Sequence, residues 1–161
     1  MLAGENIQHV SSSPMDRARA TAGPLARMRG VEVKIAEGIA EVDYGEWTGK
    51  SFDELEGDAE WRAFNSFRSW SRIPGGETML EVQARVVAEM LRLQALYPKD
   101  GVALVSHGDP IRVAIAYFLG APLDLFERME IGIASVSEVV LDEFGARVVR
   151  LNQAAPLSRD E

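Results

Sequence analysis

The segment VALVSHGDPIRVAIA, residues 102–116, constrains the fold of this chain more than any other. Val102 to Val105 is a short apolar run that predicts a buried parallel strand, and Pro110 favours the first turn of an apolar helix. Ser106 to Gly108 forms the turn between the two elements. The segment therefore predicts a strand that delivers His107 to the N-terminus of a helix.

Such a turn has a chemical meaning. The first backbone N–H groups of a helix lack partners and carry partial positive charge, so the turn suits a phosphate or another anion. Gly108 would let the backbone approach that anion closely. The alternative is that His107 only caps the strand and makes local hydrogen bonds, because α/β sheets do not place a ligand at every such turn.

Composition narrows the class of protein. A chain of 161 residues fits one domain with one core, and no apolar run approaches the ~20 residues that cross a bilayer. The formal charge of −8 argues against a nucleic-acid partner. With no cysteine and two histidines, we expect neither a metal nor another cofactor. No basic and apolar leader precedes the first strand, which predicts a cytoplasmic location.

Strand and helix patterns alternate along the first part of the chain. Ile7 to Val10 reads as a strand that leads into a helix beginning near Pro14 and ending at Gly30, with Pro24 expected to kink or restart it. Val31 to Ile35 reads as a half-buried strand. Strands separated by helices predict an α/β fold with a mainly parallel sheet and helices on both faces, a three-layer αβα sandwich.

The later segments complete the outline. Ser51 and Glu54 have capping-box spacing, and residues 58–73 read as an inserted helix and loop that would form a lid. A long amphipathic helix spans residues 80–96, and residues 135–141 and 147–151 predict a hairpin. We expect a single domain over residues 1–152 and a loose polar tail over residues 153–161.

Arg17 is a candidate anion ligand. It lies in the first turn of its predicted helix, where a basic side chain opposes the helix dipole unless an anion is present. Its planar guanidinium suits a phosphate. The alternative is a surface ion pair with Asp16, Glu41 or Asp43.

Three carboxylates follow the predicted second strand. Glu41, Asp43 and Glu46 lie close together with Tyr44 and Trp47 among them. Carboxylates crowded beside aromatic surface tend to have raised pKa values, as a general acid near neutral pH requires. One of the three would protonate a leaving group, or the loop is a solvated acidic surface whose aromatic residues belong to the core.

Two further residues have ambiguous roles. Glu77 reads as the cap of the long helix or as a second acid in a substrate pocket, and the capping role is the one we favour. His9 ends an apolar strand with neither glycine nor arginine beside it, so we expect a structural role.

Once these residues are placed, the chain resembles the histidine phosphatase superfamily, a phosphoglycerate mutase-like group of phosphohydrolases and phosphomutases. The resemblance implies the phosphoglycerate mutase-like fold and a site without metal, in which basic side chains stabilise the transferring phosphoryl group. It is carried by four ordered motifs: SSPMDRARATA, EVDYGEWTG, PGGET and VSHGDPIR.

The resemblance also implies residue roles. Arg17 would bind phosphate, Glu41 would donate a proton to the leaving alcohol, and His107 would stabilise the phosphoryl group as the second histidine. Gly108 would add a backbone donor, and Tyr44 would line the substrate pocket.

One departure from the family pattern stands out. Members begin with a central strand ending in an Arg-His-Gly triplet, whose histidine accepts the phosphoryl group, and no such triplet occurs here. The resemblance therefore implies a chain that lacks its first central strand and its nucleophile. Three explanations stay open: a truncated enzyme, a gap filled by a partner chain, or a natural non-catalytic relative.

We therefore expect a phosphomonoester phosphatase that acts through phosphohistidine on a small phosphorylated metabolite and is inactive as printed. The alternatives are a phospho-ligand-binding pseudoenzyme and a phosphomutase. An open edge in the sheet would also allow the chain to pair with a second copy as a homo-oligomer.

Overall fold

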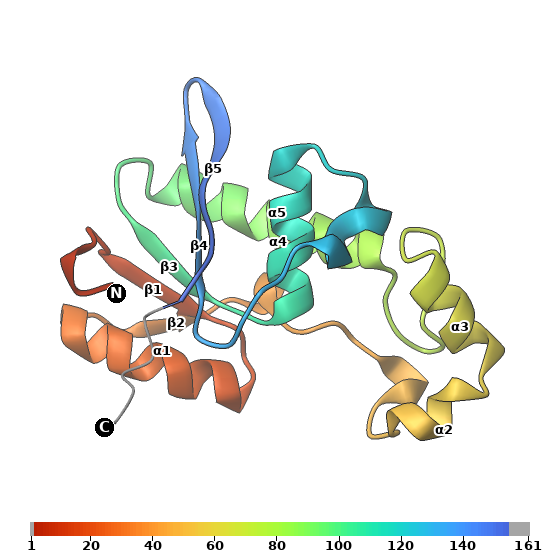
Figure 1. Ribbon diagram of the computed structural model, residues 1–161. Helices are drawn as coiled ribbons and strands as arrows, with labels where there is room; N and C mark the ends of the chain where they lie inside the picture. The colour runs from red at the N-terminus through yellow and green to blue at the C-terminus, as the bar shows by residue number, and fades with distance from the viewer. Residues whose placement is uncertain (1, 155–161) are drawn as a thin grey trace, which may run out of the picture.

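The computed structural model describes residues 2–154 as three layers of helices and strands (Figure 1). The predicted tail lies outside the described residues from residue 155 onward. The helices are α1 (Asp16–Arg29), α2 (Phe52–Glu56), α3 (Ala59–Ser66), α4 (Met79–Leu96) and α5 (Gly108–Leu119), with short 3₁₀ turns η1 (Leu2–Gly4), η2 (Glu37–Ile39), η3 (Gly45–Trp47) and η4 (Leu123–Arg128). The strands are β1 (His9–Ser12), β2 (Val33–Ile35), β3 (Val102–Val105), β4 (Val136–Asp142) and β5 (Gly145–Gln153).

Three strands form a parallel sheet in the order β2-β1-β3. In the register of β1 with β3, His9 pairs with Val102 and Ser12 pairs with Val105. The carboxyl ends of all three strands therefore lie at one edge, where α1 and α5 begin. Within residues 2–154, β4 and β5 pair only with each other, as an antiparallel hairpin. The described strands do not test whether a further central strand is missing, so that expectation stays a prediction.

Helices cover both faces of the parallel sheet, as the alternating pattern predicted. On one face, Val10 packs with Ala22 and Ala26 of α1, whose small side chains let the helix lie close to the strands. On the other face, Leu104 packs against a larger core that includes Val86 of α4 and residues of α5. Ala103 and Val105 pack with the Val10 cluster, so neighbouring residues of the half-buried strand β3 point to opposite layers.

Pro24 does not restart α1. The helix runs from Asp16 to Arg29 and ends at Gly30, whose φ of 67° gives a left-handed C-terminal cap. The missing N–H of Pro24 leaves the carbonyl of Ala20 without its helical partner. Both residues are exposed, so water can bond that carbonyl.

The inserted segment over residues 58–73 is helical in its first half and packs against the core. Phe64 of α3 is fully buried, and Trp61 meets Trp47 edge to face with ring centroids 5.2 Å apart. The backbone N–H of Ser69 donates to Asp124 of η4 at 2.8 Å. These contacts hold the segment on η4, and its predicted action as a lid stays a prediction.

The predicted capping box and hairpin are confirmed with small shifts. Ser51 and Glu54 form the capping box on α2, and Thr78 and Glu81 form a second one, not predicted, on α4. Strand β5 continues to Gln153, one residue past the predicted limit of the domain. Among residues 2–154, no helix is both long and apolar enough to cross a membrane.

Candidate active site

Arg17, Glu41 and His107 meet at the carboxyl edge of the parallel sheet, as the sequence predicted. The Nε of Arg17 donates to Nδ1 of His107 at 3.2 Å, and its Nη2 donates to Oε2 of Glu41 at 3.2 Å. The distance between His107 Nδ1 and Glu41 Oε2 is 3.6 Å. Residues separated by up to 90 positions therefore form one triangle of polar groups.

His107 is the buried member of this triangle, with 7% of its surface exposed. A guanidinium always donates, so Nδ1 accepts from Arg17 and the ring proton lies on Nε2. Nε2 then donates to Oγ of Ser13 at 2.7 Å. Burial, aided by the positive charges of Arg17 and Arg85, lowers the pKa of His107 to about 4. The imidazole is therefore neutral at pH 7. Because its partners Arg17 and Ser13 lie 90 and 94 positions away, the alternative in which His107 makes only local hydrogen bonds is wrong.

Ser13 was not singled out from the sequence, although it lies within the SSSP run. Its side chain is fully buried beside His107, and its Oγ also accepts the backbone N–H of Met15 at the start of α1. Ser13 thus fixes the imidazole plane and the beginning of the helix together.

Glu41 is half-buried, and its environment suits a proton donor. Burial raises the pKa of the Glu41 carboxyl, and the negative charge of Asp109 raises it further. The backbone N–H of Val42 and the side chain of Arg17 oppose this shift. The sequence predicted a raised pKa from crowding with Asp43 and Glu46, but both of those residues are exposed, and the neighbouring carboxylate is Asp109.

Arg17 forms one of the ion pairs considered for it, and its role as an anion ligand stays a prediction. It pairs with Glu41, one of the surface partners foreseen, and it contacts His107 in the same cluster. Asp16 pairs instead with Arg19 at 3.4 Å. The Arg17 side chain is 58% exposed. Its Nη1 makes no hydrogen bond within residues 2–154, so this face of the guanidinium is open to an incoming anion.

Gly108 is the first residue of α5, next to the His107 cap position. A Cβ atom at Gly108 would meet only Nη1 of Arg112, at 3.5 Å, which is an ordinary contact with a flexible side chain. Packing within the described residues therefore does not require glycine here. A close approach by a ligand would supply the reason that the surrounding protein does not.

Tyr44 contacts Asp109, whose negative charge also acts on Glu41 of the triangle. Its hydroxyl donates to Oδ2 of Asp109 at 3.3 Å, and Oδ1 of the same carboxylate accepts from Arg112 at 2.8 Å. Burial and the charge of Asp109 raise the pKa of Tyr44 well above its ordinary value, so the hydroxyl keeps its proton. Asp109 therefore orients Tyr44 and also acts on Glu41, a role the sequence did not reveal.

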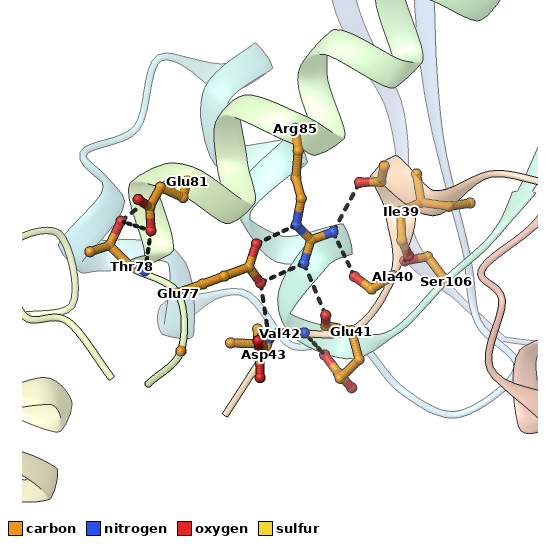
Figure 2. Close-up of polar contacts among 12 residues, drawn as sticks. Ile39, Ala40, Glu41, Val42, Asp43, Glu77, Thr78, Glu81, Arg85 and Ser106 are labelled. Atoms are coloured by element: carbon orange, nitrogen blue, oxygen red, sulfur yellow. Dashed lines mark hydrogen bonds and ion pairs between the residues drawn. The ribbon is translucent and has the colours of Figure 1, made fainter. Parts of the chain in front are cut away.

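Glu77 does not cap α4, which corrects the expectation. Thr78 is the N-cap, because its side chain accepts the backbone N–H of Glu81. The carboxylate of Glu77 instead forms a two-bond ion pair with Arg85 (Figure 2), at 2.7 and 3.0 Å. Figure 2 shows this pair beside the backbone of the loop that carries Glu41.

His9 lies away from the triangle, as expected for a structural histidine. Its Nε2 contacts Oδ2 of Asp100 at 3.0 Å, and its ring stacks on Tyr97 at a centroid distance of 3.6 Å. Ser13 lies four residue steps after His9, about 13 Å along the strand direction.

The fold and the site can now be compared with those of known proteins. The family model for the histidine phosphatase superfamily, branch 1, matches residues 1–154. The chain therefore belongs to the histidine phosphatase superfamily.

Three similar proteins, two of them named as phosphatases, are between 26% and 33% identical to this chain. A bifunctional protein of Mycobacterium tuberculosis is 33% identical over 150 residues, 90% of this chain and 40% of the relative. Phosphoserine phosphatase 1 of Hydrogenobacter thermophilus is 29% identical over 158 residues, 94% of this chain and 72% of the relative. The structure of a mycobacterial glucosyl-3-phosphoglycerate phosphatase with inorganic phosphate aligns with a TM-score of 0.77 at 26% identity, covering 92% of this chain and 78% of that one.

Proposed function

We propose that this chain carries the phosphate-binding half of a phosphomonoester phosphatase site. The observation that carries the proposal is the triangle of Arg17, Glu41 and His107, closed by distances of 3.2, 3.2 and 3.6 Å. A cation, a carboxyl group with a raised pKa and an imidazole converge next to a helix N-terminus, and all three suit phosphoryl chemistry.

Each residue has a defined role in this proposal. Phosphoryl oxygens bind the guanidinium of Arg17, the backbone N–H of Gly108 and the imidazole of His107. The dianion raises the low pKa of His107, so the imidazole takes up a proton at Nδ1, gives up its bond from Nε of Arg17 and donates the new N–H to a phosphoryl oxygen. Nε2 keeps its bond to Ser13. Glu41 in its protonated form gives its proton to the leaving alcohol oxygen. Tyr44 contacts the remainder of the substrate.

The phosphoryl group passes first to a histidine and then to water in the proposed reaction. His107 is not that nucleophile in this proposal, because Nε2 bonds Ser13 and Nδ1 carries the N–H that donates to the phosphoryl group. His9 contacts Asp100 and Tyr97 at the other end of β1. Neither of the two histidines of the sequence is therefore the nucleophile in this proposal. We therefore infer that the printed chain binds phosphate, and that hydrolysis needs a nucleophilic histidine beyond these two.

The names of the relatives support a phosphatase, since two of the three proteins compared above carry phosphatase names. A phosphoglycerate mutase-type activity is the alternative, because probable phosphoglycerate mutases of Salmonella are 30% identical over about 140 residues. A non-catalytic phosphate-binding module is the second candidate function, and it rests on the assignment of both histidines to other contacts.

Calorimetric titration with inorganic phosphate tests the proposed site. Arg17→Ala removes a charged donor, so affinity should fall about 10- to 100-fold, corresponding to roughly 1.5–3 kcal/mol for a hydrogen bond to a charged group. Arg19→Ala is the matched control, because Arg19 lies on the same helix and pairs with Asp16. Equal affinities of the Arg17→Ala variant and the parent chain would remove Arg17 from the site.

Hydrolysis of p-nitrophenyl phosphate separates the enzyme from the binding module. The printed chain should bind phosphate without turnover. A longer chain that adds a strand ending in Arg-His-Gly ahead of residue 1 should hydrolyse the ester if the site is catalytic. Phosphate binding without turnover in both chains would favour the binding module.

A further inference from the structure

Arg85 of α4 uses all of its donors on the carboxylate of Glu77 and on three backbone carbonyls of the loop that carries Glu41 (Figure 2). Its Nε and Nη2 donate to the carboxylate of Glu77. Its Nη1 donates to the backbone carbonyls of Gly38 at 3.0 Å and Ala40 at 2.8 Å, and Nη2 donates to that of Glu41 at 2.9 Å. A guanidinium has five N–H donors, so none is left for a ligand.

Glu77 holds the other side of the same loop. Its Oε2 accepts the backbone N–H of Asp43 at 2.9 Å, and its own N–H donates to the carbonyl of Asp43 at 3.1 Å. The Arg85 and Glu77 side chains are each 23% exposed, so water screens their ion pair only in part. The pair therefore fixes the backbone on both sides of Glu41.

The loop also lies tightly against α4 at Gly38. A Cβ atom at Gly38 would stand 2.7 Å from Cβ of Glu89, closer than real carbon atoms approach. The helix that supplies Arg85 thus touches the loop directly, and the guanidinium reaches three carbonyls without spanning a gap.

We propose that Arg85, braced by Glu77, is the positioning residue for the Glu41 proton donor. This inference rests on the proposed function for the role of Glu41 and adds the residues that set its location. Within residues 2–154 the guanidinium of Arg85 makes no hydrogen bond to Arg17, His107 or the Glu41 carboxylate, so it positions Glu41 through the loop backbone. A lysine cannot replace it, because an ammonium has three donors and no planar fork.

Carbon-13 NMR titration of the Glu41 carboxyl tests the proposal without requiring turnover, and Glu41→Gln assigns the signal. In Arg85→Lys the loop loosens and water reaches the carboxyl. Because burial is the main cause of the raised pKa, the pKa of Glu41 should fall to the ordinary 4.5.

Two controls separate positioning from general destabilisation. Arg92→Lys weakens a similar two-bond pair with Glu89 on the same helix, but Arg92 is exposed and its guanidinium bonds none of the loop carbonyls that Arg85 bonds. Val82→Ala removes fully buried core volume from α4 and lowers stability without touching the pair. Both variants should keep the pKa of Glu41 at its parent value.

Glu77→Gln provides a second probe that keeps Arg85 in place, and it should lower the pKa of Glu41 by a smaller amount. An unchanged Glu41 pKa in Arg85→Lys, or in Glu77→Gln should the lysine variant not fold, would overturn the proposal. An equal fall in Val82→Ala would overturn it as well. Phosphate affinity of the parent chain is measured separately, so a failure of the proposed function is distinguishable from a failure of the positioning role.

Discussion

The two histidines lie at opposite ends of the same pair of parallel strands, and their surroundings differ. His9 begins β1, where a carboxylate of Asp100 and the ring of Tyr97 contact it. His107 follows the end of β3, where the cation of Arg17 and the hydroxyl of Ser13 contact it. One imidazole has a negatively charged partner, and the other has a positively charged one.

The difference supports the proposed position of the ligand. At the amino end, His9 contacts a charged partner and a stacking partner within the protein. At the carboxyl end, Glu41 pairs with Nη2 of Arg17, while Nη1 makes no hydrogen bond within residues 2–154 and the first turn of α5 presents backbone N–H groups. The carboxyl edge is therefore the end where we propose that a phosphate binds.

The largest expected effect is the pH dependence of the free energy of unfolding that His107 causes. The pKa of His107 is lowered from 6.5 in the unfolded chain to about 4 in the folded one. The unfolded chain therefore binds more protons between these values, and the contribution of His107 to stability is lost as pH falls from 6.5 to 4. The loss is up to about 3 kcal/mol, at 1.36 kcal/mol for each pKa unit.

Urea unfolding of the parent chain and His107→Gln at pH 4.5, 5.5 and 6.5 measures this effect. The raised pKa of Glu41 acts in the opposite direction, since its contribution is lost as pH rises. The difference between the two proteins isolates the histidine. If both proteins lose stability equally on acidification, the lowered pKa of His107 is wrong.

A smaller effect concerns phosphate affinity. His107→Ala removes one donor to the bound anion and should weaken phosphate binding about tenfold, near the lower limit for a hydrogen bond to a charged group. His9→Ala should leave the affinity unchanged, because among residues 2–154 the polar and stacking contacts of the His9 ring are with Asp100 and Tyr97, away from Arg17. Calorimetric titration at pH 6.5 measures both variants. A loss in His9→Ala that matches the loss in His107→Ala would break the comparison.

The smallest expected effect is on the free energy of unfolding and comes from the His9 contacts at the amino end of the strands. His9→Ala removes a stacked ring pair with Tyr97 and a partly exposed contact with Asp100. Such pairs contribute about 1 kcal/mol, so the free energy of unfolding should fall by that amount at pH 7. Thermal or urea unfolding measures it, and a loss above that of a buried core residue would show that His9 has a larger role.

Local sequence signals predicted most of the fold. The capping box at Ser51, the glycine that ends α1 and the apolar run of β3 each act within a few residues, and the structure places these elements close to the expected positions. The cap of α4 was assigned to Glu77, whereas Thr78 is the N-cap. The predicted restart of the helix at Pro24 does not occur, because water can bond the carbonyl that a proline leaves unpaired in an exposed part of a helix.

Long-range contacts set the limits of prediction at the site. Arg17, Glu41 and His107 were expected to meet because parallel strands share one carboxyl edge. Ser13 and Arg85 were missed, since the bond from His107 to Ser13 spans 94 positions and those from Arg85 reach loop carbonyls 44 to 47 positions away. No local pattern encodes which of many serines or arginines will make such a bond.

The most direct test of the anion site is nitrogen-15 NMR of the histidine rings during a titration with inorganic phosphate at pH 6. Binding should shift the ring signals of His107 and raise its pKa from about 4, while the signals of His9 stay in place. Phosphate that shifts His9 and leaves His107 unchanged would contradict the account.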